Sequence, residues 1–216
     1  MTTPLYNSPN IVDFVLSEGD DFLSRDNAVV TQTGTAIKSG TILTQVDTGT
    51  GAFAMDGGAT GNPTSGAITV AAAAIPGAYV IEFTAATKFT VEAPNGVTIG
   101  TGTLGSAFSA GGLGFTLTAG GTPAVAGDTA KITVAAGTGK YIPYTAGGAA
   151  GVASAILYTG LAADTGDKKV VIFNKDIEVS RDKLTGLDAT AEAQLRLVGI
   201  KVRGTASLPY VSTPAL

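Results

Sequence analysis

The uneven distribution of charge is the feature that most constrains how this chain can fold. The segment 51–139 consists mainly of Gly, Ala, Thr, Val and Pro, and the rest of the chain holds 24 of the 30 charged side chains. The six charged residues inside the segment are Asp56, Glu82, Lys88, Glu92, Asp128 and Lys131. A weakly charged, turn-rich segment between two differently composed flanks predicts an inserted domain, and it predicts that the flanks form one interrupted domain.

Short runs of apolar and β-branched residues in the flanks, separated by Gly- and Asp-containing turns, predict strands. The sequence breaks them at Gly34, at Ser39-Gly40 and, after the insertion, at Asp164-Thr165-Gly166 and 182–186. The strands predicted in this way are 28–32, 36–38, 41–46, 155–159, 168–174, 177–179 and 200–203. The flanks therefore predict a discontinuous core domain, 27–50 with 140–203.

One segment of the flanks has helical spacing. Ala191, Leu195 and Val198 recur at i, i+4 and i+7, which places them on one face of a helix. Asp188 precedes them as an N-cap, and Gly199 follows as a residue that commonly ends a helix. We therefore expect a single short helix, which begins just after Asp188.

The middle segment predicts strands of its own. Apolar residues alternate with polar ones four times, and turn signals such as Pro94-Asn95-Gly96 separate the runs. Alternation at period two puts the apolar side chains on one face of a strand. The apolar sets are Tyr79, Ile81 and Phe83; Phe89 and Val91; Phe115 and Leu117; and Ile132 and Val134. Residues 51–139 are thus predicted to form an inserted all-β sandwich or barrel, with Tyr79 and Phe83 in its core.

The two ends of the chain are predicted to be extended. Pro4 and Pro9 favour extended backbone in residues 1–26, and Pro209 and Pro214 do so in the tail 204–216. Apolar residues of the first segment follow no helical or strictly alternating period, so they need another surface on which to pack. The residues expected to anchor this N-terminal arm are Leu5, Tyr6, Ile11, Val12, Phe14 and Leu16.

Composition argues against several classes of function. The chain has no His and no Cys, so it lacks the most common general base and metal ligand and any thiol nucleophile. We therefore expect neither an enzyme nor a bound cofactor or metal. A net charge of −4 without a basic cluster argues against nucleic acid as a partner. The most apolar stretch, 146–157, is shorter than the roughly 20 residues that span a bilayer, and no secretory signal opens the chain.

Two weak motifs remain. Gly100–Gly105 reads GTGTLG and matches the dinucleotide-binding pattern GxGxxG, but no helix is expected after it, so we interpret its glycines as turn residues. Carboxylates cluster at Glu18, Asp20 and Asp21, and Asp164 and Asp167 flank a turn. Such pairs could serve glycoside hydrolysis or hold Ca²⁺, but solvated turn residues that cap their own backbone are more common.

The flanks resemble the lambda-type head decoration proteins of tailed bacteriophages. The matching stretches are SEGDDFLSRDNAVV at 17–30, AIKSGTIL at 36–43, ASAILYTGLAADTGDKKVVIFNKDIEVSRDKL at 153–184 and DATAEAQLRLVGIKV at 188–202. The resemblance covers about half of the chain, and the smallest members of the family lack an insertion at 51–139. It implies a mainly β fold: a small decoration-protein core of the β-tulip type with one short helix, here interrupted by the inserted β domain.

The resemblance also implies a structural function. Members of this family sit as homotrimers on the outside of the expanded phage head, and an N-terminal arm adds a strand to the major capsid protein. The expected partners are therefore the major capsid protein and further copies of this chain. The expected location is the outer capsid surface of a virion assembled in the host cytoplasm.

Two alternatives stay open at this point. The insertion is expected to add bulk to the trimer, or else to contact the host surface or its glycans. A Gly- and Thr-rich β chain could also belong to a phage tail or fibre. A fibre typically shows repeats at a fixed period, and this sequence shows none.

Overall fold

The computed structural model describes residues 12–19, 23–147 and 151–204, which are mainly β, with 51% strand and 6% helix. These residues form two compact units. Unit 1 contains the described residues up to Gln45, Lys140–Ala146 and those from Val152 onward. Unit 2 contains Val46–Gly139, together with Gly147 and Gly151. The sequence predicted domain boundaries between residues 50 and 51 and between residues 139 and 140. The first of these lies five residues after the observed division between Gln45 and Val46.

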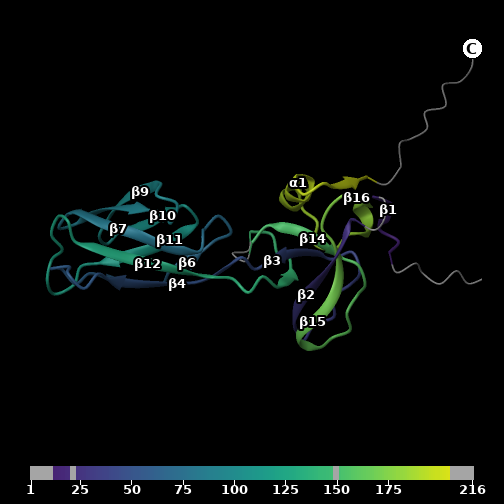
Figure 1. The fold of residues 1–216 in the computed structure, drawn as a ribbon, viewed down its shortest axis with the longest axis horizontal. Helices are drawn as coiled ribbons and strands as arrows, with labels where there is room; N and C mark the ends of the chain where they lie inside the picture. Colours follow the sequence, from purple (N-terminus) through teal and green to yellow (C-terminus); the bar gives the residue numbers. More distant parts are fainter. Residues whose placement is uncertain (1–11, 20–22, 148–150, 205–216) are drawn as a thin grey trace, which may run out of the picture. The chain divides into compact units, whose positions relative to one another are not determined.

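Unit 1 is built on a closed five-stranded barrel in the order β13-β2-β15-β14-β3 (Figure 1). Its longest pair is antiparallel and runs without a break from Arg25 opposite Phe173 to Thr33 opposite Thr165. The five strands are β2 (Arg25–Thr33), β3 (Ile42–Gln45), β13 (Tyr141–Pro143), β14 (Ala153–Leu157) and β15 (Thr165–Phe173). Alternate side chains of these strands point into the barrel and, together with the loop residue Ile37, form a small aliphatic core. The core consists of Val30, Ile37, Leu43, Ala155, Leu157 and Ile172.

A three-stranded sheet and the helix complete unit 1. The sheet has the order β1-β16-β17, in which β1 (Val15–Glu18) is antiparallel to β16 (Ile177–Ser180), and β17 (Ile200–Arg203) is parallel to β16. A parallel neighbour requires a crossover, which α1 (Ala189–Leu197) supplies. The helix buries Ala191 and Leu195, two of the three residues that the periodicity placed on its inner face. The third, Val198, is the C-cap residue and is 37% exposed.

The helix ends confirm the capping signals. The Asp188 carboxylate accepts a hydrogen bond from the Ala191 amide at 2.6 Å, which satisfies an otherwise unpaired donor of the first turn. Gly199 follows the C-cap at a φ of +84°, a left-handed conformation that glycine adopts without steric cost. The predicted helix therefore has the expected ends.

The predicted strands of unit 1 are confirmed except for 36–38. This segment makes only an isolated bridge between Ile37 and Leu161. Gly34 has a φ of +95° and Gly40 one of +77°, so the chain turns on both sides of Ile37 and no ladder develops. The apolar Ile37 is buried, but it lies in a loop.

Unit 2 consists of two sheets that enclose one core (Figure 1). The larger sheet has the order β4-β12-β7-β8-β9, with β4 (Thr48–Met55), β7 (Gly77–Ala85), β8 (Lys88–Glu92), β9 (Thr98–Thr103) and β12 (Thr129–Ala136). The smaller sheet is formed by β10 (Ala107–Ala110), β11 (Leu113–Thr118), β5 (Thr64–Ser65) and β6 (Thr69–Val70). All of the alternating apolar residues predicted to face the core of the insertion are buried.

An aromatic cluster fills the centre of unit 2. The rings of Phe108 and Phe115 lie 4.9 Å apart, and Phe89 is about equally far from both, at 6.1 Å. Gly102 lies opposite Phe89 in the β8–β9 ladder, and a Cβ atom there would be 2.2 Å from Phe89 Cζ. The glycine therefore leaves the space that the ring occupies.

One buried carboxylate organises the loops of unit 2. Asp128 is 5% exposed and accepts hydrogen bonds from the amides of Val125, Thr60 and Gly61 at 2.8–2.9 Å. Bonds to these amides, that of Val125 first, hold the pKa of Asp128 below its ordinary value of 3.8. The charged form of Asp128 thus ties together two loops that are more than 60 residues apart in the sequence.

Candidate attachment site at the terminal sheet

The sheet β1-β16-β17 brings together the points at which the two terminal segments begin. The Ser180 amide donates to the carbonyl oxygen of Phe14 at 2.8 Å, and Ser180 is also paired with Arg203 across the parallel ladder. Residues 1–11 and 205–216 therefore start from one end of this sheet. We call this end the terminal corner and define it by Phe14, Ser180 and Arg203.

Phe14 fixes the first described residues to unit 1. Its side chain is 1% exposed and packs edge-to-face against Phe173, with the ring centroids 5.8 Å apart. Val12 and Val15 pack against the same cluster, which also contains Ile177. Burial of a Phe side chain contributes about 1.5–3 kcal/mol, so the backbone from Val12 onward is firmly held.

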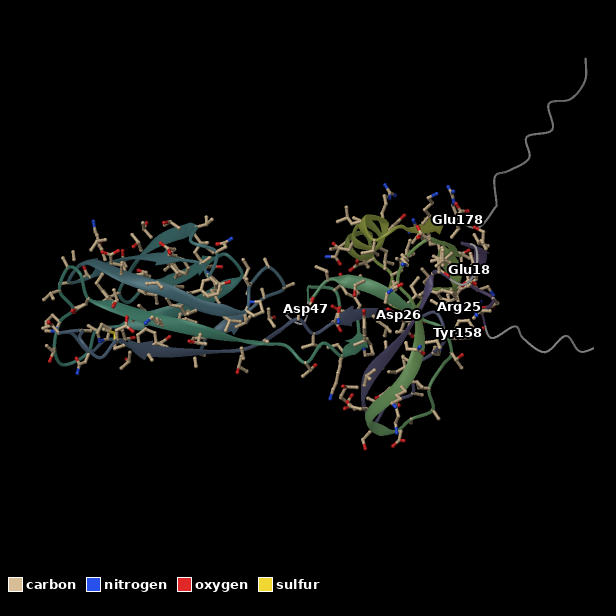
Figure 2. The ribbon with its side chains drawn as sticks, viewed as in Figure 1. Glu18, Arg25, Asp26, Asp47, Tyr158 and Glu178 are labelled. Atoms are coloured by element: carbon tan, nitrogen blue, oxygen red, sulfur yellow. The ribbon has the colours of Figure 1, made fainter. Side chains whose placement is uncertain are left out.

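A charged cluster pins the far end of β1. The Glu18 carboxylate accepts two hydrogen bonds from the Arg25 guanidinium, both at 2.7 Å, and a third from the Ser24 hydroxyl. The guanidinium also lies over the Tyr158 ring, 4.8 Å from its centroid. Figure 2 labels Glu18, Arg25 and Tyr158 in unit 1. The bonds from Arg25 are the main cause that lowers the pKa of Glu18 from its ordinary value of 4.5.

Two further ion pairs border the terminal corner. Lys183 pairs with Asp13 at 3.0 Å, and Arg203 pairs with Glu178 at 2.6 Å. The hydrogen bond from Arg203 is the main cause that lowers the pKa of Glu178. The side chains of these pairs are largely exposed, so the pairs add little to the hold that the buried Phe14 provides.

The structure places the predicted arm anchors in three different settings. Leu5, Tyr6 and Ile11 lie outside the described residues. Phe14 and Val12 pack on the core of their own chain, and Leu16, at 54% exposed, points away from it.

The predicted arm range 1–26 needs correction, because β1 and the start of β2 belong to unit 1. The assignment of Phe14 as a capsid anchor is revised because its ring is enclosed by its own chain.

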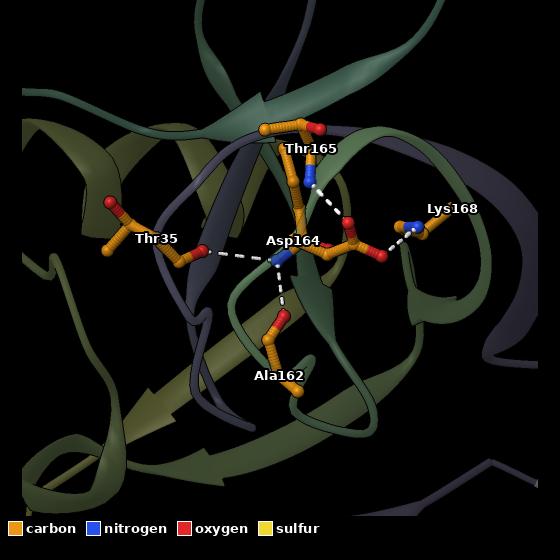
Figure 3. Close-up of polar contacts among 6 residues, drawn as sticks. Thr35, Ala162, Asp164, Thr165 and Lys168 are labelled. Carbon is orange, nitrogen blue, oxygen red and sulfur yellow. Dashed lines mark hydrogen bonds and ion pairs between the residues drawn. The ribbon is translucent and has the colours of Figure 1, made fainter.

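The carboxylates flagged in the sequence serve as structural ion-pair partners. Asp164 accepts a hydrogen bond from the Thr165 amide at 2.7 Å and pairs with Lys168 (Figure 3). Asp167 accepts a bond from Thr31 and pairs with Lys140. Asp164 thus caps its own backbone, as expected, while Asp20 and Asp21 lie outside the described residues. Within the described ranges, no three His, Cys, Asp or Glu residues group as metal ligands, and no helix is long and apolar enough to cross a membrane.

The GTGTLG motif is also structural. Gly100 and Gly102 lie in β9 against the rings of Phe108 and Phe89, and Gly105 turns the chain into β10 at a φ of +80°. A Cβ atom on Gly100 would be 3.1 Å from Phe108 Cε2. Because β10 follows in place of a helix, the motif is not a dinucleotide-binding loop. Gly105 is a turn residue as predicted, but Gly100 and Gly102 are strand residues that leave space for the two rings.

Sequence reasoning missed two features of the site. Arg25 and Tyr158 were not predicted to meet, because a cation–π contact between distant residues leaves no local pattern. Ser180 was not singled out, although its backbone defines the terminal corner. No sequence signal marks it, since its amide is what makes the contact.

The described residues form a β-rich fold whose first and last strands, β1 and β17, lie in one sheet. The sequence matches the family of bacteriophage lambda head decoration protein D over residues 4–200, and this chain belongs to that family. The resemblance found in the sequence is thereby confirmed. The family decorates phage heads, so this chain is classed with structural proteins of the virion capsid.

Other comparisons add little. No curated protein sequence matches the chain. Among solved structures, flagellar junction protein FlgL of Xanthomonas campestris has 21% identity and a TM-score of 0.33, covering 47% of this chain and 33% of that one. Flagellar hook junction protein FlgK of Burkholderia pseudomallei has 22% identity and a TM-score of 0.34, covering 59% of this chain and 24% of that one. This chain therefore spans a third or less of these two proteins, and at such TM-scores the likeness supports no argument.

Proposed function

We propose that this protein binds the outside of the expanded phage head as homotrimers and stabilises the head against the pressure of packaged DNA. The partner is the major capsid protein, to which the N-terminal arm adds a strand. The observation that carries the proposal is the family match over residues 4–200. Assembly takes place on heads in the host cytoplasm, where the protein joins the outer capsid surface.

The terminal corner supports the proposed role of the arm. Phe14, Glu18 and their contacts hold the start of β1, while residues 1–11 before it contain Pro4 and Pro9 and carry no charged side chain. Strand addition gains its affinity from main-chain hydrogen bonds and its register from alternate side chains. An arm whose base is rigid loses less freedom on binding than one attached through a loose linker.

Fewer residues are therefore proposed as capsid anchors than the sequence alone predicted. Leu5, Tyr6 and Ile11 remain in the arm, and Leu16 joins them as an exposed apolar residue on β1. Val12 and Phe14 act as the base of the arm because they pack on unit 1. Ordering costs about 1–2 kcal/mol per residue, so a single short arm binds weakly. Three arms in one trimer bind together and release slowly.

Unit 2 is proposed to add bulk to the decoration trimer. Tyr79 and Phe83 are fully buried, as the sequence predicted, and cannot present an aromatic face to a glycan. Its core is built entirely from its own residues. Contact of unit 2 with host surfaces is a second role that only the exposed residues of this unit could supply.

The proposal is tested by adding purified protein to expanded heads that lack it. We expect saturable binding near one copy per capsid subunit and loss of binding when residues 2–11 are deleted. The deletion ends before Val12 because removal of Phe14 would damage unit 1 and confuse the result. Higher resistance of decorated heads to heat measures stabilisation.

A matched variant replaces residues 47–138 with a short Gly-Ser linker. Val46 and Gly139 are joined by a backbone hydrogen bond of 3.0 Å, so such a linker has little distance to span. We expect this variant to bind heads like the full chain. Failure of the full chain to bind would overturn the decoration assignment, and binding by the 2–11 deletion would overturn the role of the arm.

A further inference from the structure

The turn between β8 and β9 carries an Asn-Gly pair, a combination with its own chemistry. Asn95-Gly96 is the only such pair in the sequence, and both residues are exposed. A side chain on the residue after Asn crowds the backbone nitrogen between the two residues, and glycine has no such side chain. A Cβ atom on Gly96 would meet nothing within 4 Å. The Gly96 nitrogen is therefore accessible to the Asn95 side chain.

Backbone hydrogen bonds give this turn a defined shape. The Gly96 amide donates to the carbonyl oxygen of Ala93 at 2.9 Å, and the Ala93 amide donates to that of Val97 at 2.8 Å. Gly96 has a φ of +79°, the left-handed conformation that follows a β-turn in many hairpins. The turn is thus closed at its base, while its tip, residues 94–96, is exposed to water.

The side chain of Asn95 bends back along the turn. Its Oδ1 accepts a hydrogen bond from the Val97 amide at 3.2 Å, which is the contact of an Asx turn. The ring closed by this bond includes the Gly96 nitrogen, so it limits how far the Asn95 Cγ atom can move from that nitrogen. The Val97 N–H also points at the oxygen on which negative charge would develop if Cγ were attacked.

We propose that Asn95 is a site of spontaneous deamidation in the folded protein. Opening of the bond to Ala93 frees the Gly96 N–H, whose proton passes to hydroxide. The Gly96 nitrogen then forms a bond to Cγ of Asn95, and the bond from Cγ to the side-chain nitrogen breaks. That nitrogen takes a proton from water and leaves as ammonia, so a five-membered succinimide remains. Water opens this ring at either carbonyl and leaves aspartate or isoaspartate.

The modification changes unit 2 without any partner. Each conversion replaces a neutral amide by a carboxylate and adds one negative charge to a formal net charge of −4. Isoaspartate also lengthens the main chain at the tip by one carbon, which disturbs the two backbone bonds of Ala93 that close the turn. The extent of conversion therefore records the age of the protein. This chemistry is separate from capsid binding, and its test needs no head.

Peptide mass spectrometry of the full chain, incubated in its folded state at a mildly alkaline pH, tests the proposal. Conversion at Asn95 is expected to be about tenfold or more faster than conversion at Asn62 and Asn174. Asn62 is the matched control within the same unit, because the next residue is Pro63, whose nitrogen carries no hydrogen to lose. Asn174 precedes a lysine and tests the need for glycine.

A pair of variants tests the role of the Val97 N–H. Val97→Pro removes this donor and should slow conversion by about threefold to tenfold, less than the loss of a donor from a water-excluded oxyanion hole. Val97→Ala keeps the donor, and Val97 is 55% exposed, so this control should convert like the unchanged chain. Thermal unfolding of unit 2 shows whether both variants keep the fold.

Three results would contradict the proposal. Conversion of Asn95 only after unfolding in urea would mean that the turn protects the pair, and this comparison depends on neither variant. Equal conversion at Asn174 would mean that Gly96 gives the site no advantage. Equal rates in the two Val97 variants, both folded, would remove the role of the Val97 N–H.

Discussion

Units 1 and 2 use their polar residues in different ways. Unit 1 holds eight of the nine ion pairs within the described ranges, and these fix strand ends and the terminal corner. Unit 2 holds one, between Lys131 and Asp56, and binds its loops through Asp128 and backbone amides. Both units have a buried apolar core, so the charge break in the sequence corresponds to a difference in polar contacts: mostly exposed ion pairs in unit 1, and a buried carboxylate bound to backbone amides in unit 2.

The largest change in the free energy of unfolding is expected when a buried ring is removed from the core of one unit at a time. Phe14→Ala should destabilise unit 1 by about 3–5 kcal/mol because it empties a buried ring site. Phe89→Ala should do the same to unit 2. Urea unfolding, monitored by hydrogen exchange in peptides from each unit, measures the free energy of unfolding of the two units separately. Each substitution should leave the other unit within about 0.5 kcal/mol. A shift of both units by one substitution would show that the chain unfolds as one body.

A smaller effect tests how tightly the aromatic core of unit 2 is packed. Gly102→Ala places a methyl group in the space of the Phe89 ring and should cost about 1–3 kcal/mol, measured by thermal unfolding of unit 2. Gly58→Ala is the matched control, since a Cβ atom there meets nothing within 4 Å. Equal stability of the two variants would mean that Phe89 moves aside at little cost.

The smallest effect concerns acid. The folded-state pKa of Asp128 lies below 3.8, so its contribution is present above about pH 4 and is lost as the pH falls through the folded-state value. Asp128→Asn should therefore lower the stability of unit 2 at pH 7 and flatten its dependence on pH between about 5 and 2. Because the Asp128 carboxylate binds backbone amides, added salt should change little the difference in stability between the Asp128→Asn variant and the unchanged protein. The same salt should weaken the exposed ion pairs of unit 1. A variant with an unchanged acid profile would contradict the role given to Asp128.

Much of the fold follows from sequence patterns because those patterns are local. The alternation through Tyr79, Ile81 and Phe83 and the capping by Asp188 each depend on residues a few positions apart. Phe14 shows where such reasoning ends. An apolar residue near a terminus, without a period, suits its own core as well as a partner, and only the tertiary structure shows that Phe173 receives it. Ile37 shows the same limit. The sequence predicted a strand at 36–38, but the turns at Gly34 and Gly40 leave only an isolated bridge at Ile37.

The candidate site was predictable only in outline. Pro4 and Pro9 pointed to an extended arm, but the corner at which it begins depends on the backbone of Ser180. The pairing of β2 with β13 at Val30 alone, before β13 ends at Pro143, has no signature in the sequence. Long-range strand pairing is set by topology, which a local pattern does not carry.

The hydrogen bond between Val46 and Gly139 has a consequence for engineering and for evolution. Gln45 lies opposite Tyr141 in the barrel, so the chain leaves and returns on neighbouring strands, and the bond between Val46 and Gly139 continues that pairing. The entropic cost of joining two ends grows only slowly with the length of the loop between them, and here the ends are already held together. The connection from β3 to β13 is therefore a permissive grafting point. A foreign domain with adjacent termini could replace unit 2 there with little strain on the barrel.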